Sequence, residues 1–162
     1  MKNILIIMVN VFLFWSCSNI KNKEIGKENV LNDTTQVLNT INNVFGWAVN
    51  KDFELFFNSL ANDSNFISVT PYNRVKHGFV EVLKDTSFWA NPSFKAVSHE
   101  LGDVHLQFSE DDTVVWFYCV LNDYNTWDGK PINWENVRWT GIVEKRDGEW
   151  KVVQQHFSFA AS

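Results

Sequence analysis

Hydrophobic residues recur with two different periods along this chain, and the change of period separates a helical first part from a strand-rich second part. In the first part, apolar side chains return every three or four positions, which is typical of amphipathic helices. This spacing predicts helices over 33–47, 52–61 and 79–89. Short alternating stretches predict two brief strands between the second and third helices, at 66–70 and 75–77.

From residue 94 onward the pattern is that of consecutive β-strands. Residues 94–101 and 104–108 form one such stretch, with a bulge expected at Gly102. Residues 114–121 are all non-polar or aromatic, which is typical of a strand covered on both faces. Residues 125–133 predict a loop. Helices followed by a long antiparallel sheet predict an α+β fold.

The last two predicted strands form the strongest hairpin signal, because Asp147-Gly148 accepts the positive φ angles of a tight primed turn. A two-residue turn there places Glu144 opposite Lys151 and Val143 opposite Val152. The first is a favourable charge pair and the second an apolar pair, so this register is self-consistent. A three-residue loop would shift the pairing.

Alternation along this hairpin assigns each side chain to one of two faces. With the two-residue turn, Trp139 lies opposite His156. One face then carries Trp139, Gly141, Val143, Trp150, Val152, Gln154, His156 and Ser158. The opposite face gains an apolar stripe formed by Ile142, Val153, Phe157 and Phe159.

The first 17 residues predict an export signal. Lys2 precedes an apolar run that is too short to span a bilayer and ends at Ser16-Cys17. The stretch resembles a bacterial lipoprotein signal, which implies that Cys17 is lipidated and anchors the protein in the cell envelope. Ser18 favours the outer membrane. An ordinary secretory signal with a chance cysteine is the alternative.

The chain is therefore divided into a signal (1–17), a polar flexible tether (18–32) and one domain (33–162). Its net charge is −5 without a basic cluster, which argues against nucleic acid as a partner. The eight tryptophans and fourteen phenylalanines suit a lined cavity or an oligomer interface. Cys119 lies in an apolar run and is expected to be a buried free thiol. No spacing of cysteine or histidine indicates a metal site, and no cofactor is expected.

The order of elements and the ending of the chain resemble the SnoaL-like branch of the nuclear transport factor 2-like superfamily. Members tend to show a Gly-Xaa-Trp turn and a His-Xaa-Ser ending, here Gly148-Glu149-Trp150 and His156-Phe157-Ser158. Gly78 matches the glycine that opens the third helix. The resemblance implies a cone, in which a curved antiparallel sheet wraps around three helices and leaves a pocket at its open end. It also implies a homodimer formed through the outer face of the sheet.

His156 and Ser158 are the first candidates for the pocket wall, with Gln154 and Trp139 beside them to orient a ligand. The alternative is a histidine that only helps to hold the sheet against the helices. Trp116 and Tyr118 offer polar tips if their face lines the cavity; core packing is the alternative. Tyr72 is placed at the mouth by the resemblance.

Three functions remain open. Many enzymes of this superfamily use an aspartate before a proline as general base, and Thr70 precedes Pro71 here, where it cannot take a proton at neutral pH. This favours a membrane-tethered module that binds a small apolar or carbonyl-bearing molecule without transforming it. An isomerase, cyclase or dehydratase that uses His156 as acid or base is the second hypothesis. A dimerisation or assembly domain without a ligand is the third.

Overall fold

The computed structural model of the protein describes residues 31–160. Residues 31–35 are helical and belong to a first unit, and Gln36–Ser162 form a second. The second unit begins with a helix over 36–46 and continues with α2 (Phe53–Ser59), α3 (Phe79–Leu83) and α4 (Thr86–Ala90). Its strands are β1 (Ile67–Val69), β2 (Val75–His77), β3 (Phe94–Phe108), β4 (Val114–Trp127), β5 (Lys130–Pro131), β6 (Trp134–Arg146) and β7 (Glu149–Ser158).

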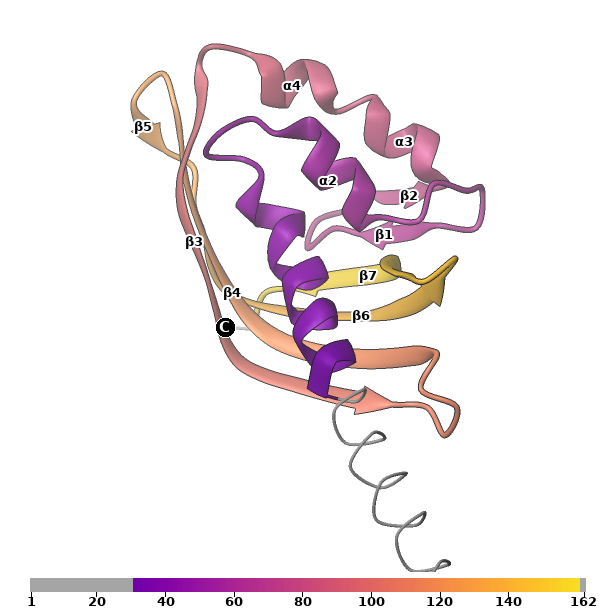
Figure 1. The fold of residues 1–162 in the computed structure, drawn as a ribbon. Coiled ribbons are helices and arrows are strands. Elements are labelled where there is room, and N and C mark those ends of the chain that lie inside the picture. The colour runs from indigo at the N-terminus through magenta and orange to yellow at the C-terminus, as the bar shows by residue number, and fades with distance from the viewer. Residues whose placement is uncertain (1–30, 161–162) are drawn as a thin grey trace, which may run out of the picture. The chain divides into compact units, whose positions relative to one another are not determined.

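The strands form one sheet in the order β2-β1-β7-β6-β4-β3, with β5 paired to β4. Neighbouring strands are antiparallel except β1 and β7, which run parallel. The long strands β3 and β4 bend around the helices (Figure 1). This curled sheet around helices confirms the predicted α+β cone. The expected third helix is two short ones, α3 and α4, which Lys84 and Asp85 separate.

The core lies between the helix over 36–46 and the concave face of the sheet. Its helical side is formed by Val37, Ile41 and Val44, which recur at helical spacing and are almost fully buried. The facing sheet residues alternate along each strand, and the buried ones are Val115, Phe117, Cys119, Leu121, Val137, Trp139, Val143, Trp150, Val152 and Phe157.

The closing hairpin has the predicted turn. Asp147 and Gly148 adopt φ angles of 52° and 86°, and Arg146 pairs with Glu149 on either side of them. Glu144 lies opposite Lys151 as expected, although the ion pair of Lys151 is with Glu149, at 2.7 Å. The first part of the predicted register is therefore correct.

Beyond Val152 the register is corrected by a β-bulge. Val143 pairs with Val152 and Ile142 with Gln154, so Val153 has no partner on β6. Trp139 consequently pairs with Phe157, and His156 pairs with Thr140. The extra residue exchanges the two faces of the strand end.

The face assignments beyond the bulge change accordingly. Gln155 and Phe157 point inward and are buried, while His156 points outward and is exposed. The predicted apolar stripe on the outer face thereby loses Phe157.

The predicted loop over 125–133 is largely ordered strand. β4 runs on to Trp127, and Asp128-Gly129 form a tight turn with φ angles of 48° and 78° that leads into β5. The expected bulge near Gly102 is present, between Gly102 and His105. The longer β4 and the added β5 extend the sheet at this end.

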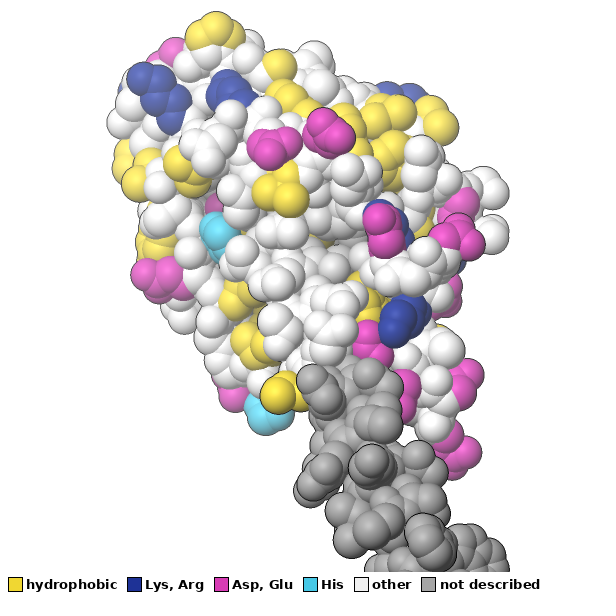
Figure 2. All heavy atoms as spheres, viewed as in Figure 1, with side chains coloured by type: hydrophobic (Ala, Val, Ile, Leu, Met, Phe, Trp, Pro, Cys, Tyr) yellow, Lys and Arg dark blue, Asp and Glu magenta, His cyan; other side chains and the backbone are white. Residues whose placement is uncertain are grey.

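The outer face of β4 differs from its prediction as a strand covered on both sides. Trp116 is 48% exposed, and Tyr118 and Val120 are half-buried, because no described element packs on this face. Other apolar side chains gather on the surface over α3 and α4 (Figure 2), where Val80 and Leu83 are exposed. Lys and Arg side chains on the face shown are scattered among acidic ones. Within residues 31–160, no helix is long and apolar enough to cross a bilayer.

Candidate functional site

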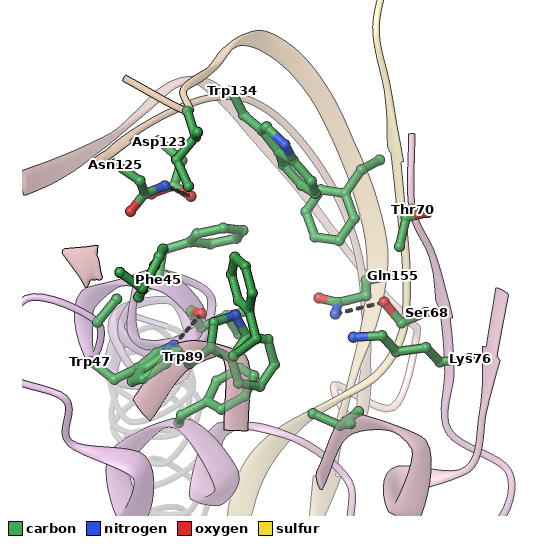
Figure 3. A pocket seen from close by; sticks show the side chains of 18 of the residues that line it. Phe45, Trp47, Ser68, Thr70, Lys76, Trp89, Asp123, Asn125, Trp134 and Gln155 are labelled. Atoms are coloured by element: carbon green, nitrogen blue, oxygen red, sulfur yellow. Dashed lines mark hydrogen bonds between the residues drawn. The ribbon is translucent and has the colours of Figure 1, made fainter. Parts of the chain in front are cut away.

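A cavity of about 500 Å³ lies at the end of the cone, between the helix over 36–46, α2, α4, β1 and the ends of β4, β6 and β7 (Figure 3). Its volume is in the range of small-molecule sites, about 300–1,000 Å³. Much of its wall is aromatic, with rings from Phe45, Trp47, Phe56, Phe88, Trp89, Phe94, Trp134 and Phe157. Such a wall favours a flat or bulky apolar ligand.

Two β-bulges bring several lining residues to this wall. On β6, Glu135 and Asn136 together oppose Asn122 of β4, and Asn136 has a φ of 55°. The bulge turns Trp134 inward, although residues of the opposite parity, such as Val137, face inward elsewhere on β6. The bulge at Val153 does the same for Gln155 and Phe157 on β7. Irregularities of the sheet therefore shape the site.

One polar group of the cavity consists of Ser68 on β1, Lys76 on β2 and Gln155 on β7. All three residues are buried, at 4%, 8% and 6% exposure. Gln155 Nε2 donates a hydrogen bond to Ser68 Oγ over 3.1 Å, which ties the side chains of two parallel strands together. The Lys76 ammonium lies on the same side of the cavity (Figure 3).

Lys76 is held by an ion pair with Asp85 and by the ring of Trp89, whose centroid lies 5.4 Å from the ammonium nitrogen. Arg74 shares the same carboxylate, with its Nη1 atom 3.0 Å from Asp85 Oδ1. Two cations therefore share one anion in this cluster. Of the two, Lys76 lines the cavity, and its ammonium can donate a hydrogen bond to a ligand's acceptor.

The second polar group is formed by Asp123 and Asn125, both on β4. Asn125 Nδ2 donates to Asp123 Oδ2 over 2.7 Å. Burial among the aromatic walls raises the pKa of the Asp123 carboxyl to about 6, although the hydrogen bond from Asn125 opposes that shift. Asp123 can therefore exchange a proton close to neutral pH.

Two buried oxygens that belong to cavity-lining residues accept no hydrogen bond from the described residues. They are Asn125 Oδ1 and Gln155 Oε1. The Gln155 oxygen is directed into the cavity, away from Ser68 (Figure 3). A buried acceptor without a donor costs about 1–3 kcal/mol, so both atoms are sites where a ligand can contribute binding energy.

Most of the residues predicted for the pocket lie elsewhere. Tyr72 does line the cavity, at its exposed rim, where its ring meets those of Trp134 and Phe159. Trp139 is fully buried in the core, stacked on Phe157. The remaining predicted residues lie on the outer face of the sheet, because they have the opposite parity to the inward-facing ones: Gln154, His156, Ser158, Trp116 and Tyr118.

Two further predictions concern cysteines and metals. Cys119 is a free thiol in the core, as expected, and burial raises its pKa to about 12, so it is unreactive. Cys17 lies outside the described residues. Within residues 31–160, no cluster of three or more His, Cys, Asp or Glu side chains has the arrangement of a metal site.

Sequence reasoning missed Asp123, Asn125, Lys76 and Gln155. The signal for the first two was available, since the alternation of β4 continues inward from Leu121 to Asp123 and Asn125. For Gln155 the signal was Phe157, two residues later. A phenylalanine on the predicted outer face indicates that the strand changes which residues face inward before this point.

Comparison with known proteins agrees with this architecture. The sequence profile of the SnoaL-like domain family matches residues 37–162. No protein with a curated function matches the chain significantly by sequence.

Several solved structures share the fold. A candidate scytalone dehydratase from Novosphingobium aromaticivorans is 12% identical with a TM-score of 0.70, and the match covers 84% of this chain and 93% of the other. A candidate dehydratase of the nuclear transport factor 2-like family from Streptomyces avermitilis is 20% identical with a TM-score of 0.61, covering 81% and 98%. The CaMKII hub homology domain from Chlamydomonas reinhardtii is 15% identical with a TM-score of 0.60, covering 79% and 98%. At these identities the likeness shows the fold alone.

Proposed function

Because the chain belongs to the SnoaL-like domain family, we propose that its aromatic cavity binds a small, largely apolar molecule and that the protein works as a binding module. The family often binds small ligands or acts as an enzyme. The observation that carries the proposal is the cavity of about 500 Å³, whose wall is largely apolar, rich in aromatic rings and contains a few buried polar groups. This combination of an apolar wall and sparse polar groups is typical of small-molecule sites.

Absence of the family's usual base supports binding over catalysis. Thr70 stands where that aspartate is expected, and its hydroxyl donates a hydrogen bond to the Arg74 carbonyl over 3.0 Å. The hypothesis that used His156 as acid or base inside the pocket loses its support, because His156 is exposed on the outer face of the sheet.

The proposal is tested by placing a bulky side chain in the cavity, at the end of β1. Thr70 lines the cavity and its neighbour Val69 does not, so Thr70→Trp and Val69→Trp form a matched pair. Native mass spectrometry of the full chain in detergent would detect co-purified molecules, and calorimetry would measure binding of biphenyl as a probe. We expect binding in the wild type and in Val69→Trp but not in Thr70→Trp. Equal binding in both variants, or no binding by the wild type, would contradict the proposal.

Attachment to a membrane through Cys17 is part of the same proposal. It is supported by the apolar run that precedes Cys17 and by the polar stretch over 18–32, which is long enough to separate an anchor from the domain. Labelling of bacterial cells that express the chain with a radioactive fatty acid tests it. We expect label in the wild type and none in Cys17→Ala; an unlabelled wild type would leave only an ordinary export signal.

Proton transfer by Asp123 is a second candidate function. It is favoured by a carboxyl group with a pKa of about 6 inside an aromatic cavity. Two of the similar structures are candidate dehydratases, whose chemistry needs an acid or a base. If a captured ligand carries a carbonyl group, its incubation in deuterated water tests this function. Deuterium uptake that the wild type accelerates and Asp123→Asn does not would establish catalysis; equal uptake with both would leave the binding module.

Pairing of two chains through the outer face of the sheet is the third element. Trp116 on β4 is 48% exposed on this face, beside Ile142 on β6. A tryptophan so placed is typical of an interface. Sedimentation at several concentrations should show a dimer for the wild type and a monomer for Trp116→Glu. Val80→Glu, on the exposed side of α3, is the control and should remain dimeric.

A further inference from the structure

The cavity has two clusters of polar side chains that sit apart in its largely apolar wall. Gln155, Ser68 and Lys76 lie on one side, and Asp123 and Asn125 on another (Figure 3). On each side, one amide nitrogen already donates a hydrogen bond to another side chain of the protein. Gln155 Nε2 donates to Ser68, and Asn125 Nδ2 donates to Asp123.

These internal bonds leave the oxygen of each amide as the atom without any partner. These oxygens, Gln155 Oε1 and Asn125 Oδ1, can only accept hydrogen bonds, and both residues are 6% exposed. The carboxylate form of Asp123 is also only an acceptor. A ligand whose polar groups were themselves acceptors, such as an ether or a ketone, would leave these oxygens without donors.

We propose that Gln155 and Asn125 select a ring-containing ligand that donates a hydrogen bond at each of its two ends. This inference rests on the proposed function and specifies its ligand class: hydroxyl or N–H groups on an aromatic body. The aromatic wall accepts the rings, and the two amide oxygens accept the donors. A hydroxyl suits the Gln155 side best, because it can donate to Gln155 Oε1 and accept from the Lys76 ammonium.

The experiment compares probes of matched shape by calorimetry on the full chain in detergent. The donor probes are hydroquinone, 4,4′-dihydroxybiphenyl and 4,4′-dihydroxystilbene, which differ in the distance between their hydroxyls. Each is compared with its dimethyl ether, which keeps the rings and loses the donors. We expect at least one diol to bind about tenfold more tightly than its ether. 4,4′-Diaminobiphenyl distinguishes N–H from hydroxyl donors.

Two variants assign the preference to the two oxygens. Gln155→Met and Asn125→Leu keep the size of each side chain and remove the acceptor, so each should reduce the preference of the best diol over its ether. Gln155→Glu retains an acceptor and should retain the preference. Circular dichroism and thermal unfolding establish that each variant is folded before binding is compared.

The outcomes separate this inference from the function on which it depends. If ethers and diols bind the wild type equally, and Thr70→Trp abolishes both, the cavity binds ligands but the proposed selection is wrong. The same conclusion follows if the diol preference persists in both Gln155→Met and Asn125→Leu. If no probe binds to the wild type, the proposed function fails together with the inference.

Discussion

Trp139 pairs with Phe157 across β6 and β7, and their rings stack with centroids 5.3 Å apart. This pairing exists because Val153 is an unpaired extra residue between Val152 and Gln154. The bulge thus decides which side chains of β7 reach the core and the cavity, because regular pairing of the same sequence would turn His156 inward in place of Phe157.

Insertion of one alanine between Val153 and Gln154 should destabilise the protein strongly. With a single residue still bulged, alternation would carry Phe157, now 4% exposed, to the outer face and bring His156 inward. Loss of the burial of one phenylalanine alone costs about 2–3 kcal/mol, and a buried histidine without a partner adds to it. Urea denaturation should show a loss of at least about 3 kcal/mol. Deletion of Val153 removes the bulge but keeps every later pair of β7, so it should lose much less; equal losses would contradict this account.

Gly141→Ala should be destabilising because its space is already occupied. A Cβ atom there would lie 2.5 Å from the backbone oxygen of Gln154 and 2.5 Å from Phe117 Cε1. The backbone atom cannot move without disturbing the β6–β7 ladder, so we expect a loss of about 2–3 kcal/mol in thermal or urea unfolding. Gly102→Ala is the control, since its Cβ would meet nothing within 4 Å. A Gly141→Ala protein as stable as Gly102→Ala would show that this contact is relaxed.

Asp123→Asn should change how stability depends on pH. Burial raises the pKa of Asp123 from 3.8 to about 6 in the folded state. Below 3.8 the carboxyl is protonated in both states, and its favourable contribution is lost as pH rises from about 4 through 6. The variant avoids this loss, so it should be about 1–3 kcal/mol more stable relative to wild type at pH 7.5 than at pH 4.

Urea unfolding at the two pH values measures this difference. Asp111→Asn provides a control of opposite sign, because hydrogen bonds from Ser109 and Thr113 lower the pKa of Asp111. A pH profile of Asp123→Asn parallel to that of the wild type would show that Asp123 titrates normally.

Asp63→Ala should weaken the junction between the closing hairpin and β1. Asp63 pairs with Arg146 and accepts hydrogen bonds from the amides of Asn65 and Phe66, at 2.7 and 3.0 Å. The hydrogen bond from Arg146 lowers the pKa of Asp63, so this stability is present above the unfolded value of 3.8 and is lost as pH falls. We expect a loss of about 1–2 kcal/mol at pH 7 that shrinks towards pH 3.

Asp63→Asn separates the two roles of this residue. The amide oxygen can still accept from Asn65 and Phe66, while the charge that Arg146 faces is gone. An intermediate loss of stability is expected. If Asp63→Asn were as unstable as Asp63→Ala, the ion pair with Arg146 would account for the whole effect.

Local signals in the sequence were sufficient for the elements and for much of the fold. Asp147-Gly148 defined the turn because only certain residues accept two positive φ angles, and the pairs Glu144–Lys151 and Val143–Val152 then defined the register. Helical spacing located the buried positions Val37, Ile41 and Val44 in the same way.

The site was harder to predict, because it depends on interruptions of these periods. A bulge such as that at Val153 leaves little trace in the stretch Val152 to Gln155, since the two glutamines suit either face. The end of β4 was also placed too early. Polar Asn122 and Asp123 after Leu121 resemble the end of an apolar strand, whereas the strand continues and Asp123 lines the cavity. Polar residues on an inward face break the hydrophobic pattern, and such breaks are expected at functional sites.

The bulge at Val153 decides which of two sets of side chains on the last strand faces inward. With the bulge, the cavity receives an amide and a phenyl ring from Gln155 and Phe157; if Val153 were paired in a regular strand, alternation would offer Gln154 and His156 in their place. One codon gained just after Val153, with the bulge kept, would thus exchange a neutral lining for an ionisable one, with every other codon unchanged. Among relatives of this chain, the presence of a bulge in the last strand is therefore as informative about ligand chemistry as the identity of any single residue in it.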